Sequence, residues 1–136
     1  MATYREIVEA ARGEIEEITP AQVMKRLNKI VLIDVREADE HQQGAIPEAR
    51  FLARGVLERD IATVVIDRKD ELVLYCSGGS RSALAAAALK QMGYERVVSM
   101  AGGFDRWKAE GLPWGDPTGL TADQRTRYAR HVRLPE

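Results

Sequence analysis

Two short and almost uninterrupted apolar runs restrict the fold of this chain more than any other feature. They occupy Ile30–Val35 and Leu72–Tyr75, and a third apolar segment follows at Val97–Ser99. Strands that are buried on both faces of a parallel sheet have such continuous apolar runs. Parallel strands need crossover segments, usually helices, and the small-residue run Ser82–Met92, which ends at Gly93, is predicted to be one. The sequence therefore predicts an α/β fold whose mostly parallel central sheet is flanked by helices.

Further helices are predicted near the amino terminus. Apolar residues recur there at helical spacing, opposite charged ones: Tyr4, Ile7, Val8, Ala11 and Ile15. A second helix is predicted to start at Thr19, with Pro20 in its first turn and Gln22 completing a capping box. The stretch Thr63–Ile66 is ambiguous, because it is β-branched enough for a strand and also fits the end of a helix that begins near Gly55.

The one cysteine of the chain, Cys76, lies between a predicted strand and a predicted helix. The residues that follow it are Ser77, Gly78, Gly79, Ser80 and Arg81. The amino end of a helix favours an anion, because its N–H groups are unpaired and its dipole is positive there. Two glycines allow the positive φ angles that turn several N–H groups toward one point. We interpret Cys76 as a thiolate nucleophile held by residues 77–81, with Arg81 as a cation at the rim or a brace within the loop.

Cys76 and the residues near it also allow other assignments. Inert packing is the alternative for the cysteine itself, because cysteine is among the most buried residue types. Asp34 and Arg36 follow the first predicted strand, so they are expected at the same sheet edge as Cys76, in a supporting role. The hydroxyls of Ser80 and Ser82 are able to bond a sulfur anion, although serine at a helix start is more often a cap.

Composition indicates an ordinary globular domain. Of 136 residues, 45% are apolar and 30% charged, and 20 basic residues nearly balance 21 acidic ones, so we expect neither nucleic acid nor a membrane as partner. One cysteine and two histidines are too few soft ligands for structural zinc, and His41 is interpreted as a solvated surface residue. The sequence shows no signal peptide, and a lone cysteine suits the reducing cytoplasm.

Three segments match, in order, the signatures of one protein family. They are VLIDVREADEHQQGAIPEA (Val31–Ala49), the loop CSGGSRS, and GYERVVSMAGGFDRW (Gly93–Trp107). On these segments the chain resembles the single-domain rhodaneses over about Ile18–Trp114. The resemblance implies a rhodanese-like domain at 18–114, a helical extension at 1–17, and a linker with a basic helix at 115–136.

The resemblance also implies sulfurtransferase activity without an organic cofactor or a metal. Cys76 would take sulfur from thiosulfate or a cysteine desulfurase as a persulfide and pass it to an acceptor, with residues 77–81 binding the anion. Ser77 stands where many family members have Arg or Lys, which helps to hold thiosulfate. Ala45 and Glu48 stand where the family often has His and Gly. These positions shape a turn and take no part in the chemistry.

Two other functions stay open at this point. One is a rhodanese-like module that docks or senses without catalysis. The other is a cysteine-dependent phosphatase, for which the six-residue loop Cys76–Arg81 is one residue shorter than the related Cys-x5-Arg loop.

The carboxyl-terminal tail is a second informative segment. After a turn-rich linker, a helix is predicted from Thr121, with Gln124 in the capping-box position and several arginines: Arg125, Arg127, Arg130 and Arg133. A solvated basic helix is one interpretation. The string DQRTRYARHVRLPE also resembles the start of E1-like adenylating enzymes of the ThiF and MoeB type, which activate ubiquitin-like sulfur carriers. That resemblance implies such an enzyme and its carrier as partners, in molybdopterin or thiamine biosynthesis.

Overall fold

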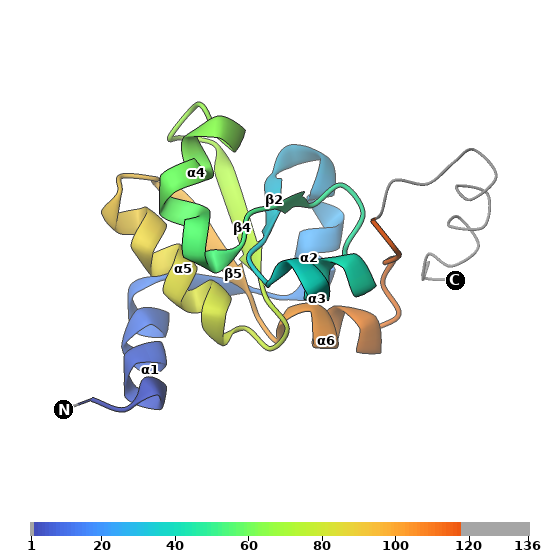
Figure 1. The fold of residues 1–136 in the computed structure, drawn as a ribbon, viewed down its shortest axis with the longest axis horizontal. Coiled ribbons are helices and arrows are strands. Elements are labelled where there is room, and N and C mark those ends of the chain that lie inside the picture. Colours follow the sequence, from blue (N-terminus) through green and yellow to red (C-terminus); the bar gives the residue numbers. More distant parts are fainter. Residues whose placement is uncertain (1, 118–136) are drawn as a thin grey trace.

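The protein folds around one parallel β-sheet (Figure 1). The computed structural model describes residues 2–117, and within this range five strands form a sheet in the order β1-β5-β4-β2-β3. All neighbouring strands run parallel, so helix-bearing segments cross over between them. The strands are β1 (Glu16–Ile18), β2 (Val31–Asp34), β3 (Arg50–Phe51), β4 (Glu71–Tyr75) and β5 (Arg96–Met100).

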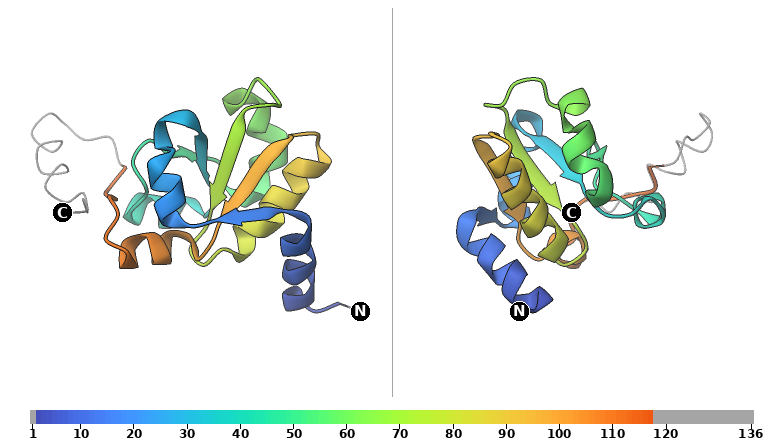
Figure 2. Two further views of the ribbon diagram at one scale, coloured as in Figure 1. Left: turned by 180° about the vertical axis from the view of Figure 1, so that it is seen from behind. Right: turned by 60° about the vertical axis from the view of Figure 1, so that its left-hand side comes forward.

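Helices cover both faces of the sheet (Figure 2). One face carries α1 (Tyr4–Glu14), α4 (Leu57–Val64) and α5 (Ser80–Gln91). The other carries α2 (Pro20–Lys25) and α6 (Gly103–Ala109). The short helix α3 (Ala38–Gln43) follows β2, and two 3-10 turns complete the described structure at Leu27–Lys29 and Arg54–Val56.

Side chains of the two central strands alternate between two apolar cores. The core beneath α1, α4 and α5 receives Ile33, Leu72 and Leu74. The core beneath α2 and α6 receives Leu32, Val73 and Tyr75. Both faces of β2 and β4 are therefore dry, which explains why their sequences are apolar throughout. The predicted α/β fold with a parallel, helix-covered sheet is confirmed.

Several local predictions are confirmed by the helix ends. Thr19 accepts from the backbone N–H of Gln22, whose side chain accepts from the N–H of Thr19, and Pro20 opens α2. The ambiguous stretch 63–66 resolves as a helix end, because α4 continues to Val64. A 3-10 turn starting at Arg54 precedes α4, close to the predicted start.

Two features differ from the sequence-based expectations. Strands β1 and β3 were not predicted, because they have three and two residues and no period to detect. Helix α5 begins at Ser80 rather than Ser82, since the positive φ of Gly79 places the helix start directly after it. The predicted domain boundary between residues 17 and 18 stays a prediction, and β1, which pairs with β5, contains both residues.

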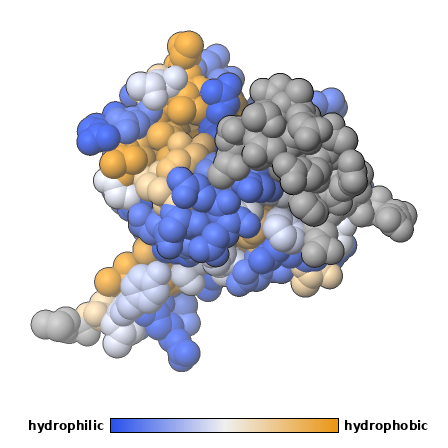
Figure 3. All heavy atoms as spheres, turned by 45° about the vertical axis from the view of Figure 1, so that its right-hand side comes forward, coloured by the Kyte–Doolittle hydropathy of each residue, from blue (hydrophilic) through white to orange (hydrophobic). Residues whose placement is uncertain are grey.

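The described surface is largely polar. Hydrophilic side chains cover the centre of the face drawn in Figure 3, with apolar side chains gathered mainly above. Among residues 2–117 the large exposed apolar side chains are Tyr4, Ile7 and Ile66. No helix in this range combines the length and the apolar character that crossing a membrane would require. The predicted helix from Thr121 lies outside the described residues.

Candidate active site

Cys76 lies directly after β4, where the chain turns into α5. Its sulfur accepts the backbone N–H of Gly79 at 3.1 Å and that of Ser82 at 3.4 Å, and the thiol contacts the Ser82 hydroxyl oxygen at 3.5 Å. The side chain is 1% exposed. The sulfur is thus enclosed, but the surrounding N–H groups point at it rather than away, which is the arrangement that favours an anion.

The start of α6 holds the loop after Cys76 in place through backbone hydrogen bonds. The N–H groups of Phe104 and Asp105 donate to the carbonyl oxygens of Cys76 and Ser77 at 2.8 and 3.0 Å. Gly103 makes this approach possible, because its φ is +60° and a Cβ there would overlap both carbonyl oxygens. In a trans peptide the N–H points opposite to the C=O. Fixing these carbonyls against α6 therefore turns the following N–H groups away from α6.

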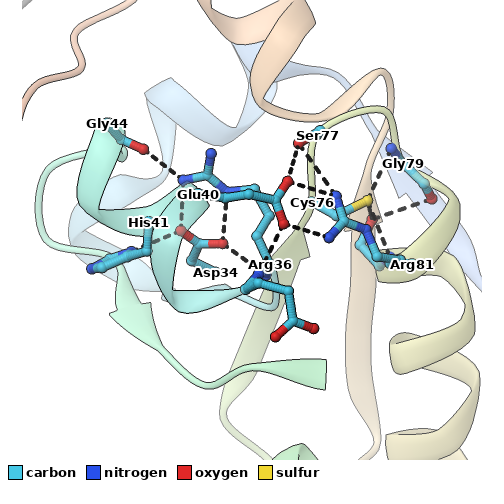
Figure 4. Close-up of polar contacts among 11 residues, drawn as sticks. Asp34, Arg36, Glu40, His41, Gly44, Cys76, Ser77, Gly79 and Arg81 are labelled. Atoms are coloured by element: carbon cyan, nitrogen blue, oxygen red, sulfur yellow. Dashed lines mark hydrogen bonds and ion pairs between the residues drawn. The ribbon is translucent and has the colours of Figure 1, made fainter. Parts of the chain in front are cut away.

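A carboxylate from α3 clamps the loop at both ends (Figure 4). Glu40 accepts two hydrogen bonds from the Arg81 guanidinium, at 2.6 and 2.9 Å, and a third from the Ser77 hydroxyl at 2.9 Å. The hydrogen bonds from Arg81 lower the pKa of Glu40 from 4.5 to about 2, and this pairing also raises the pKa of Arg81. Of the two roles considered for Arg81, the geometry is that of a brace.

Glu40 was missed by the sequence analysis. The one available signal was the acidic segment within Val31–Ala49, and nothing in it indicates which carboxylate meets Arg81.

Asp34 is the centre of a buried polar network beside the clamp. One carboxylate oxygen accepts the backbone N–H and Nε–H of Arg36, at 3.0 and 2.9 Å. The other oxygen lies 2.8 Å from Arg36 Nη2, 3.1 Å from the Tyr75 hydroxyl and 2.8 Å from Nδ1 of His41. Burial, followed by the charge of Asp34, raises the pKa of Tyr75. The register explains the site, since Asp34 is paired with Tyr75 and Cys76 comes next.

The prediction that His41 is a solvated surface residue is wrong. Its side chain is 17% exposed, bonds to Asp34 and stacks on Phe51 with ring centroids 4.6 Å apart. The reason is that the short α3 lies against the end of β2, which brings His41 to the carboxylate of Asp34, seven positions earlier.

The remaining candidate residues occupy different places around the loop. Ser82 contacts the sulfur and also lies 2.8 Å from the hydroxyl of Ser99, which the sequence analysis did not single out. Ser80 is the first residue of α5, and its hydroxyl makes none of the hydrogen bonds found to the sulfur among residues 2–117. Apart from Gly78 and its two chain neighbours, no heavy atom of residues 2–117 lies within 4 Å of a Cβ built on Gly78, so the loop is open there.

Comparison with known proteins identifies the family. Residues 19–110 match the rhodanese-like domain. The chain belongs to this family. Over 107 residues the rhodanese is 35% identical to a sulfurtransferase from Allochromatium vinosum, covering 79% of this chain and 98% of the relative. Sulfur transfer is therefore supported at the level of the family.

Two further matches bear on the alternatives. The chain is 32% identical to the probable adenylyltransferase/sulfurtransferase MoeZ of Mycobacterium tuberculosis. The match covers 77% of this chain and 27% of MoeZ. The fold is also similar to the structure of a Rhodopseudomonas palustris protein of unknown function, described as a possible tyrosine phosphatase. The TM-score is 0.75 and the sequence identity is 31%, and the match covers 83% of this chain and 94% of that one.

Proposed function

We propose that this rhodanese carries sulfane sulfur as a persulfide on Cys76, between a sulfur donor and a thiophilic acceptor. The observation that supports this most directly is the convergence of the Gly79 and Ser82 N–H groups on the sulfur atom. Preorganised N–H groups stabilise a charge that develops during reaction without any reorganisation cost. Arg81 and Glu40 hold the loop in that geometry from outside.

The reaction consists of two half-reactions, sulfur loading and sulfur transfer. In the first, the Cys76 thiolate attacks the outer sulfur of the sulfur donor, and a bond forms between the two sulfurs. The bond between that sulfur and the rest of the donor breaks, and its electron pair leaves with the rest, which is sulfite if the donor is thiosulfate. In the second, an acceptor nucleophile bonds to the outer sulfur, and the electron pair of the broken S–S bond returns to Cys76.

The sulfur donor is proposed to enter at Gly78. Cys76 is 1% exposed, and the open space at Gly78 is the part of the loop without packed neighbours within 4 Å of its Cβ position. Ser77 is neutral and Arg81 is paired with Glu40, so the loop itself offers no unpaired cation to thiosulfate. This favours a protein persulfide, such as that of a cysteine desulfurase, over thiosulfate.

The partners are proposed to be an E1-like adenylating enzyme and its ubiquitin-like sulfur carrier, in the cytoplasm. The support is the tail sequence DQRTRYARHVRLPE together with the similarity to the probable adenylyltransferase/sulfurtransferase MoeZ. An activated carrier needs sulfur delivered to its carboxyl terminus, and a persulfide supplies it. Binding of the chain to an immobilised adenylating enzyme or carrier at micromolar concentration is expected, and its absence would count against this partnership.

Phosphatase activity is the second candidate function, and the similarity to the Rhodopseudomonas palustris protein is its support. Two observations argue against it. The loop Cys76–Arg81 is one residue shorter than the Cys-x5-Arg loop of phosphatases, and the Arg81 guanidinium is bound to Glu40. A non-catalytic module is the third candidate. The N–H groups aimed at Cys76 argue against that one.

Intact-protein mass spectrometry tests the three functions. The chain is incubated separately with thiosulfate, inorganic polysulfide and a persulfidated cysteine desulfurase, and the desulfurase arm is expected to add 32 Da, about one sulfur, to Cys76. Cys76→Ala is expected to gain nothing. Absence of an adduct with all three donors would support the non-catalytic module, and hydrolysis of an aryl phosphate that requires Cys76 would support the phosphatase.

A further inference from the structure

A pocket of about 230 Å³ adjoins the reactive loop on the side of α3 and α6. Arg36, Glu40, Gly44 and Ser77 line one part of it, and all four are labelled in Figure 4. Ser77 immediately follows Cys76, so the pocket shares a wall with the loop that would hold the persulfide. In open α/β sheets the carboxyl edge of the strands is where ligands bind.

The other lining residues of the pocket combine aromatic rings with two charges. Phe104 and Trp114 meet edge to face with ring centroids 5.8 Å apart, and the Trp114 ring rests against Gly44. The Lys108 ammonium lies 4.9 Å from the centroid of Phe104 and 5.4 Å from that of Trp114. Asp105, three residues earlier on α6, lines the same pocket.

Some charged side chains of this pocket already form ion pairs with other residues of the range 2–117, and others do not. Arg36 is bound to Asp34, and Glu40 is bound to Arg81. None of the ion pairs among residues 2–117 includes Lys108 or Asp105. The pocket therefore presents one cation and one anion that are available to a ligand.

We propose that this pocket binds a second acceptor of the persulfide sulfur, in addition to the protein carrier, and that this second acceptor is a small zwitterionic thiol of the amino-acid class. Lys108 would take its carboxylate and Asp105 its ammonium group, with the carbon skeleton on the rings. The volume holds about eight water molecules at the density of liquid water, enough for an amino acid and too little for a folded partner. The proposal rests on the proposed function for the persulfide itself.

The transfer step is balanced. The acceptor thiolate attacks the outer sulfur of the Cys76 persulfide, and a new S–S bond forms on the acceptor. The bond between Cys76 Sγ and the outer sulfur breaks, and its electron pair stays on Cys76 as the thiolate. The products are an amino-acid persulfide and the regenerated enzyme.

Four thiols that differ in charge test the proposal: cysteine, 3-mercaptopropionate, cysteamine and 2-mercaptoethanol. The measurement is kcat/KM for sulfur removal from the loaded protein, taken as the ratio of variant to wild type, so that intrinsic thiol reactivity cancels. Lys108→Met is expected to lower this ratio about fivefold to tenfold for cysteine and 3-mercaptopropionate alone. Asp105→Asn is expected to lower it for cysteine and cysteamine alone.

Matched controls lie on the opposite edge of the sheet. Lys69→Met and Asp70→Asn remove the same charges from the exposed turn before β4 and are expected to leave all four ratios at one. Equal changes for the four thiols in the Lys108 and Asp105 variants, or no change, would overturn the proposal.

Binding without chemistry separates this proposal from the function on which it rests. Alanine is titrated into Cys76→Ala while the indole N–H signal of Trp114 is followed by NMR. A saturable shift that disappears in Lys108→Met supports the pocket even if no donor loads Cys76. A Trp114 signal that stays unmoved by alanine contradicts it.

Discussion

At the scale of single residues, the reactive loop depends on where backbone groups point. The sulfur of Cys76 receives N–H groups from Gly79 and Ser82, whereas the carbonyls of Cys76 and Ser77 are bound to the first turn of α6. Gly79 achieves its orientation with a φ of +103°. A position such as this one favours glycine, because side chains rarely adopt a positive φ.

Gly103→Ala is expected to destabilise the protein by about 1 to 3 kcal/mol and to slow sulfur loading of Cys76. The added Cβ would meet the carbonyl oxygens of Cys76 and Ser77 at a backbone angle that also disfavours alanine. Urea unfolding and the rate of the mass change measure the two effects. The control is Gly13→Ala in α1, where an added Cβ would meet no atom of residues 2–117 within 4 Å apart from its own neighbouring helix backbone. It is expected to be neutral or stabilising by up to about 1 kcal/mol. Equal stability of both variants would refute this account.

At the scale of elements, the short helix α3 and the reactive loop act as one unit. The helix has six residues, too few to be stable alone. Its Glu40 ties it to Arg81 and Ser77, and its His41 ties it to Asp34 at the end of β2. The helix is therefore stabilised by the same contacts that hold the loop.

Glu40→Gln is expected to slow persulfide formation on Cys76 about tenfold and to lower stability by about 1 kcal/mol, since the clamp is partly exposed to solvent. An amide presents one acceptor oxygen to a guanidinium that now meets two. Stopped loading reactions read by mass spectrometry give the rate. Glu58→Gln on α4 removes a comparable ion pair with Arg54. Within the described structure neither residue makes a hydrogen bond to residues 76–82, so this variant is expected to keep the wild-type rate. A similar loss in both variants would show that the clamp has no special role.

At the scale of the whole molecule, the strand order places the functional residues together. Because β2 lies beside β4, the residues that follow both strands meet at one edge, and α6 arrives there from β5. An apolar core lies on each face of the sheet. The charges gathered at the edge also couple folding to pH.

Acid is expected to destabilise the protein in part through Glu40. Its pKa is about 2 in the folded protein and 4.5 ordinarily, so its contribution is fully present above pH 4.5 and is lost as pH falls through 2. After solvent screening this amounts to about 1 to 2 kcal/mol. Urea unfolding at pH 5 and pH 3 measures it, and Glu40→Gln is expected to show a shallower fall than wild type. An unchanged slope in the variant would contradict the assignment.

The sequence by itself determined the features that depend on near neighbours. Continuous apolar runs marked β2 and β4, a capping box marked the start of α2, and a cysteine before two glycines marked the reactive loop. These signals act over a few residues, because strand burial, capping and turn geometry are local. The parallel α/β fold and the position of Cys76 followed from them.

Only the tertiary structure decided which distant groups meet. Arg81 and Glu40 are 41 positions apart, and several other carboxylates were equally plausible partners until β2 was placed beside β4. The hydrogen bond between His41 and Asp34 also depends on how the elements pack. The same is true of the pairing of the edge strands β1 and β3. A hydrogen bond between remote residues depends on the packing of the elements that carry them. Local periodicity in the sequence does not indicate that packing.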